Sequence, residues 1–83
     1  MKSGFENSTE ERIKQAVVRA LRIAVTDQTA PLRMGSTPGW DSMGHMTVVL
    51  ELEREFNTRF PSYQLPLLVD VPSIAKTLNG EPV

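Results

Sequence analysis

The pair Asp41-Ser42 is the part of the sequence whose residue types and position most clearly allow chemistry. It follows a loop that ends in Pro38 and Gly39 and precedes a helical pattern. A serine in the first turn of a helix presents its hydroxyl beside backbone N–H groups without intrahelical partners, and these groups and the helix dipole stabilise a phosphodiester. Ser42 is therefore a candidate site for the covalent attachment of a group through a phosphodiester. The simpler alternative is that both residues only cap the helix.

His45 lies one turn after Ser42, so a hydrolase triad with Asp41 is a second hypothesis. Three residues within five positions at one helix start cannot form the orienter, base and nucleophile chain of a triad, and no second segment supplies an oxyanion hole. We therefore reject the triad. His45 is expected at the rim of the site, and Trp40 is expected to fill space in the core.

The composition limits the other chemistry that this chain can perform. Its 83 residues include no cysteine, which excludes a thiolate metal site and a thiol nucleophile, and the single histidine cannot form a zinc site by itself. A chain of this length buries only about 60 to 65% of its unfolded surface, so it closes one core without also enclosing a deep catalytic cavity. We expect one domain over residues 1–83, with an ordered core over about 8–79.

The charge is nearly balanced, with 9 basic and 10 acidic side chains and a net charge of −1, so the sequence lacks the basic surface of a nucleic-acid binder. Residues 1–40 hold six basic and four acidic side chains, a sum of +2, whereas residues 41–83 hold three and six, a sum of −3. The second half is therefore expected to meet a basic partner. No stretch approaches the roughly 18 apolar residues of a spanning helix, so we expect no membrane partner and a cytoplasmic location.

Periodicity predicts an all-α fold. A capping-box spacing at Ser8 and Glu11 predicts the start of a first helix of about 16 residues, whose inward face extends to Ala24. A second helix is expected from Asp41 to about Phe56, with Pro61 as its stop. After an irregular turn within residues 62–69, a short third helix follows the Asp70 cap and ends at Asn79-Gly80. The expected architecture is a small antiparallel four-helix bundle, three main helices and one short one, with a long loop over 25–40.

The second predicted helix is apolar over a wider arc than packing on one core requires. One apolar stripe suits the core, and a second stripe of Met43, Met46 and Leu50 is expected to face a partner. Glu53 lies beside Met46 around the helix axis, next to this second stripe. The narrow polar arc comprises Gly44, Thr47, Glu51, Arg54 and Glu55. The acids Glu51, Glu53 and Glu55 are expected to form a solvated face, with partner contact as the alternative for Glu53.

The string from Gly39 to Pro61 resembles the attachment region of acyl carrier proteins. The family pattern is Asp-Ser-Leu at the start of the second helix, then spaced apolar residues, an acidic cluster and a Phe, and finally an apolar residue followed by Pro. Asp41 and Ser42 match this pattern, Met43 replaces the leucine, and Phe56 and Pro61 are in register. The resemblance covers about residues 8–79 and is most specific over 41–61.

This resemblance implies that Ser42 receives 4′-phosphopantetheine from coenzyme A through a phosphopantetheinyl transferase. Asp41 would help to orient the metal and phosphate during transfer, and acyl groups would then ride as thioesters on the thiol of the arm. The domain itself would not be an enzyme. It would act as a monomer that visits acyl-loading, synthase or transferase enzymes of one pathway, with partner contacts expected at Met43, Met46, Leu50, Glu53 and Arg54.

The chain departs from the fatty-acid members of the family because Gly44, Thr47 and Arg54 dilute the acids of the second helix. Arg54 would repel a basic partner, which favours a dedicated pathway of polyketide type or other secondary metabolism over general fatty-acid synthesis. Two alternatives remain open. The chain could be an amino-acyl or peptidyl carrier, or it could be an unmodified helical interaction module with the carrier fold.

Overall fold

The structure is a computed structural model that describes residues 3–23 and 32–80. It contains three α-helices and one 3₁₀ helix, in the order α1 (Ser3–Leu21), α2 (Ser42–Phe56), η1 (Ser62–Leu67) and α3 (Val71–Leu78). Within the two described ranges no strand forms, and the only sheet-like pairing is an isolated antiparallel bridge between Arg33 and Asp70. The prediction of a mostly helical domain is therefore confirmed for this part of the chain.

The predicted start of the first helix is wrong, because α1 begins at Ser3 and runs through the capping-box spacing at Ser8. No proline interrupts the residues before Ser8, so nothing prevents the helix from extending toward the N-terminus. The helix ends at Leu21 because Arg22 takes a left-handed conformation with φ 56°. Ala24, expected as the last residue of the inward face, lies outside the described residues.

The second helix has the predicted extent, but its predicted stop is wrong. It ends because Asn57 adopts a left-handed conformation with φ 51° and donates its backbone N–H to the Glu53 carbonyl. Asparagine tolerates this conformation better than most residues with a side chain. Pro61 instead precedes η1, which replaces the irregular turn expected from the sequence and contains Pro66.

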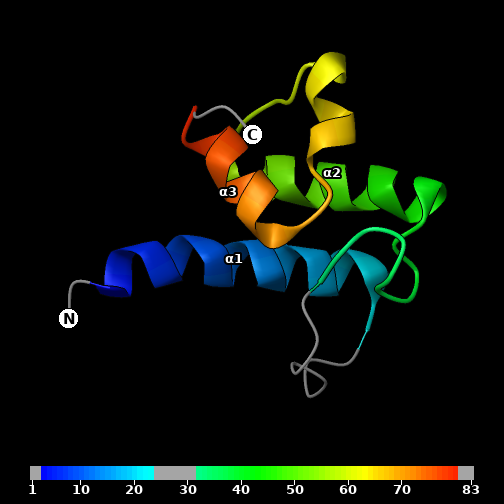
Figure 1. Ribbon diagram of the computed structural model, residues 1–83, viewed down its shortest axis with the longest axis horizontal. Coiled ribbons are helices and arrows are strands. Elements are labelled where there is room, and N and C mark those ends of the chain that lie inside the picture. The colour runs from blue at the N-terminus through cyan, green and yellow to red at the C-terminus, as the bar shows by residue number, and fades with distance from the viewer. Residues whose placement is uncertain (1–2, 24–31, 81–83) are drawn as a thin grey trace.

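The helices α1 and α2 lie side by side (Figure 1) and run antiparallel, because Arg12 and Arg19 of α1 pair with Glu55 and Glu51 of α2, respectively. The chain before α2 folds back on the core as predicted. Trp40 is 1% exposed, and Leu32 and Met34 pack against the same cluster. The buried apolar side chains of that cluster are Ile13, Ala16, Val17, Trp40, Val48, Val49, Leu52, Leu68, Val71 and Ile74.

The third α-helix forms where the sequence predicted it. Asp70 is its N-cap, Pro72 stands in the first turn, where its missing N–H leaves no gap in the helix, and Asn79 is the C-cap. The inward side chain Ile74 is fully buried, and Leu78 packs against the core. Figure 1 shows α3 beside the α1–α2 pair, and in that view η1 lies on the other side of α2 from α1.

Candidate functional site

The start of α2 presents Ser42 as the first helical residue, in an exposed position. Asp41 is the N-cap, with extended backbone angles, and one of its carboxylate oxygens accepts the Gly44 N–H at 2.8 Å. The N–H groups of Ser42 and Met43 have no acceptor among the described residues. These two donors and the positive end of the helix dipole lie at the same helix start as Ser42, and such a helix start favours a bound anion.

Gly44 lets the loop approach this helix start closely. A Cβ atom on Gly44 would overlap the backbone carbonyl oxygen of Gly39 and would lie 3.3 Å from a methyl carbon of Leu21. Gly39 itself has φ 85°, a conformation that side-chain-bearing residues rarely adopt. Packing therefore requires a glycine at position 44, because only a residue without a Cβ lets the loop lie against the first turn of α2.

The prediction that His45 lies at the rim of the site is wrong, since its side chain is buried with 6% exposure. Its Nδ1 accepts the Trp40 Nε1–H at 2.9 Å, and its Nε2 lies 2.8 Å from the Leu65 carbonyl oxygen. Indole nitrogen only donates and a carbonyl oxygen only accepts, so the imidazole is the neutral tautomer with its proton on Nε2. The Trp40 and His45 rings also stack at an interplanar angle of 24°.

This Trp40–His45–Leu65 network fastens the start of α2 to the loop before it and to η1. Trp40 lies two residues before the serine, His45 lies three residues after it, and Leu65 belongs to η1. Both imidazole nitrogens are occupied inside the protein, so His45 is not a base for the Ser42 hydroxyl. The geometry thus agrees with the rejection of a hydrolase triad. The sequence does signal the burial of His45, because it precedes Val48, Val49 and Leu52 at the i, i+3, i+4, i+7 spacing of the core face. It does not signal the partners Trp40 and Leu65.

The second apolar stripe of α2 is exposed, as the sequence predicted. Met43 is 83% exposed, Met46 52% and Leu50 58%, whereas the core stripe beside them is buried. We call Met43, Met46 and Leu50 the outer stripe. In η1, which the His45–Leu65 contact ties to α2, Tyr63 and Leu67 are exposed as well.

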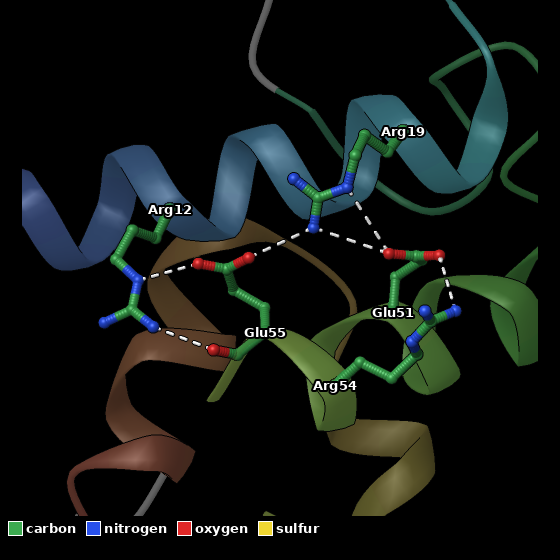
Figure 2. Close-up of polar contacts among 5 residues, drawn as sticks. All are labelled: Arg12, Arg19, Glu51, Arg54 and Glu55. Carbon is green, nitrogen blue, oxygen red and sulfur yellow. Dashed lines mark hydrogen bonds and ion pairs between the residues drawn. The ribbon is translucent and has the colours of Figure 1, made fainter. Parts of the chain in front are cut away.

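Glu51 and Glu55 do not form the solvated face that the sequence predicted, because both acids meet α1 (Figure 2). Arg12 Nε donates to Glu55 at 2.8 Å, Arg19 donates to Glu55 at 3.1 Å, and Arg19 also lies 3.4 Å from Glu51. The Arg12 guanidinium further donates to the Glu55 carbonyl and lies over the Phe56 ring. The hydrogen bond from Arg12 lowers the pKa of Glu55 against the opposing effect of burial, and Arg19 contributes in the same direction.

The two charged residues predicted to contact a partner differ in their surroundings. Glu53 is half-buried, and its carboxylate accepts the Phe60 N–H at 2.9 Å, so it fastens the chain that follows α2. The Arg54 side chain is 80% exposed and is 3.8 Å from Glu51, a long contact at the surface. Of these two side chains, Arg54 is the one that is free to meet a partner.

An open cavity of about 480 Å³ lies away from Ser42, between α1, the 32–36 segment and the start of α3. It is lined by Glu10, Lys14, Leu32, Arg33, Ser36, Asp70, Val71 and Pro72. Its two bases and two acids give it no net charge preference. Nowhere in residues 3–23 or 32–80 do three His, Asp or Glu side chains gather closely enough to hold a metal ion.

Comparisons of the chain with protein-family models, with curated proteins and with solved structures find no match. The helices in the described part of the chain are too short or too polar to cross a membrane.

Proposed function

We propose that the protein is an acyl carrier protein that bears 4′-phosphopantetheine on Ser42. The observation that carries this proposal is the position of Ser42, which is exposed, first in α2, beside two N–H groups that have no acceptor among the described residues and next to the outer stripe. An exposed hydroxyl at a helix start accommodates a phosphodiester, and the outer stripe offers a surface for the enzymes that load and unload the arm.

In the transfer step, the Ser42 oxygen would form a bond to the phosphorus that carries pantetheine in coenzyme A. The bond from that phosphorus to the oxygen that bridges the two phosphates would break, and 3′,5′-ADP would leave with the bridging oxygen. The serine proton would pass to a base of the transferase. Asp41 would contribute the carboxylate oxygen that does not hold Gly44 N–H, and so would orient the metal and phosphate. The bound arm supplies a thiol on which an acyl group is held as a thioester.

Within this proposal, the helices form the antiparallel four-helix bundle of the family, connected by a long loop. The protein would work as a cytoplasmic monomer without enzymatic activity and would serve a dedicated pathway of polyketide type or other secondary metabolism. Its partners would be a phosphopantetheinyl transferase and the loading, synthase or transferase enzymes of that pathway. An amino-acyl or peptidyl cargo is the alternative within the same class.

The mass of the intact protein tests the attachment. After incubation with coenzyme A, Mg²⁺ and a broad-specificity phosphopantetheinyl transferase, we expect a gain of one phosphopantetheine. Ser42→Ala should abolish the gain, whereas Ser62→Ala should retain it. Ser62 is the matched control because it is also exposed and is also the first residue of a helix, η1. An unmodified wild-type chain, or a Ser42→Ala chain that still gains the mass, contradicts the proposal.

A second candidate function is an interaction module that never carries the arm. The outer stripe favours it, since exposed apolar side chains bind a partner whether or not Ser42 is modified. The same mass measurement separates the two functions, because only the carrier gains phosphopantetheine.

A further inference from the structure

The outward face of α2 has a charge opposite to the one that its sequence suggests. The helix contains three glutamates and one arginine. Of its charged side chains, however, only Arg54 is exposed, at 80%, whereas the side chains of Glu51 and Glu55 are 25% and 24% exposed. A partner that approaches α2 from solvent therefore meets a cation.

Each glutamate of α2 is engaged within the domain. Glu55 pairs with Arg12 and Arg19, Glu51 lies between Arg19 and Arg54, and Glu53 accepts the Phe60 N–H (Figure 2 shows the first two acids). The guanidinium groups of Arg12 and Arg19 offset the negative charge of Glu55 and Glu51, so these two carboxylates present little net charge to a partner in solvent. Two acids of the second half of the sequence are thus partly neutralised by Arg12 and Arg19 of α1.

Arg54 continues the outer stripe. Met43, Met46, Leu50 and Arg54 follow one another at spacings of three, four and four residues, which places them along one side of α2. Arg59 is also exposed and lies at the same end of the helix, because its neighbour Phe60 is bonded to Glu53 in the last turn of α2. The stripe therefore runs from Met43, beside Ser42, through apolar side chains to a cationic end.

We propose that the outer stripe binds a protein partner whose docking surface combines an apolar patch with a carboxylate cluster positioned against Arg54 and Arg59. This partner chemistry is the reverse of the basic partner expected from the charge count of the sequence. That the partner is a pathway enzyme rests on the proposed carrier function, but the surface chemistry does not. Charges at the rim of an interface chiefly set the association rate and the choice of partner, whereas the apolar contacts supply area.

Two synthetic peptides serve as probes for this chemistry. Both form an amphipathic helix with the same leucine stripe, and they differ only at one end, which carries three glutamates in one peptide and three lysines in the other. Titrated into the unmodified full-length protein at low salt and followed by fluorescence anisotropy, the glutamate peptide should bind at least about threefold tighter. The preference should shrink as salt is added, because exposed charges are screened.

Reversing the charge of a single side chain tests which residue of the protein causes the preference for the glutamate peptide. Arg54→Glu should abolish or invert it, whereas Lys76→Glu, the same charge change on an exposed residue of α3, should leave it in place. Met43→Ser should weaken the binding of both peptides by the same factor, because it removes apolar contact without changing charge. Equal binding of the two peptides, preference for lysine, no measurable binding, or a loss of preference in Lys76→Glu equal to that in Arg54→Glu overturns the proposal.

The outcome is independent of the attachment test. A peptide preference in a protein that gains no mass would leave the surface assignment standing and remove the carrier function. A mass gain without any peptide preference would leave the carrier function standing and remove the surface assignment.

Discussion

The domain has two α-helices that begin in nearly the same way, and only one of them forms a candidate site. Asp41 caps α2 and Asp70 caps α3, each from an extended backbone, and each accepts the N–H of the residue three positions on, at 2.8 and 2.9 Å. Each start also has a serine within the first turn, Ser42 in α2 and Ser73 in α3. Local capping chemistry alone therefore does not distinguish them.

Their surroundings distinguish the two helix starts. Asp70 is half-buried, and its backbone forms an isolated antiparallel β-bridge with that of Arg33. The Met34 N–H also donates to the Val69 carbonyl at 2.8 Å, so the start of α3 is fastened to the 32–36 segment. Val71, the first residue of α3, is buried. Ser42, in the same position of α2, is exposed and adjoins the outer stripe. A capped helix start becomes a possible attachment site only where the tertiary structure leaves it open.

Gly44→Ala should have the largest effect on this comparison. The new Cβ would overlap the Gly39 carbonyl, and a backbone atom cannot rotate away, so we expect a loss of about 3 kcal/mol in the free energy of unfolding. Urea unfolding measures it. The matched variant is Ser73→Ala, the equivalent third position of α3, which should cost less than about 1 kcal/mol. Equal losses of unfolding free energy in the two variants would show that the close approach of the loop is not the reason why residue 44 must be glycine.

Trp40→Phe tests the network that has no counterpart at the start of α3. It removes the only donor to His45 Nδ1 in the described residues and leaves that nitrogen buried without a partner, so we expect a loss of about 2 kcal/mol. His45→Leu should be comparably destabilising. The double variant should lose less than the sum of the two, because the pair acts as one unit. Strict additivity in urea unfolding would contradict the coupling.

Sequence reasoning located both helix starts because capping and helical periodicity are local properties. Asp41 and Asp70 were identified as caps, and the outer stripe was separated from the core by its angular position alone. The first helix was the exception, since a capping-box spacing marks a possible start and does not exclude an earlier one. The left-handed Asn57 was missed because a proline nearby gave a stronger signal.

The contacts that sequence reasoning missed join segments far apart in the chain. His45 is buried because Trp40 and Leu65 meet it in space, and Glu51 and Glu55 are paired because α1 lies antiparallel to α2. The burial of His45 agrees with the core period of α2, but its two partners and the pairing of the acids with α1 leave no periodic trace. The total charge of a segment was for the same reason a poor guide to the charge that solvent meets.

Removing each cap should produce a smaller and unequal effect. Asp70→Ala should cost about 1 to 2 kcal/mol, and Asp41→Ala about 0.5 to 1 kcal/mol, because the exposed helix start can recruit water in place of the lost carboxylate. Urea unfolding of both variants at neutral pH gives the two values. An Asp41→Ala loss larger than that of Asp70→Ala would mean that exposure does not decide what a cap contributes.

The charge of the Asp70 carboxylate should make the free energy of unfolding depend on pH. Burial raises its pKa, but the hydrogen bonds from Ser73 and the charge of Arg33 outweigh burial and lower it below the usual value. A carboxyl whose folded pKa lies below its unfolded pKa contributes its full stability above the unfolded value and loses it as the pH falls through the folded one. Asp70→Asn keeps a capping oxygen without the charge, so its stability should fall less steeply than that of the wild type between about pH 5 and pH 2. Parallel curves of unfolding free energy against pH would show that the charge of Asp70, as distinct from its capping geometry, contributes nothing.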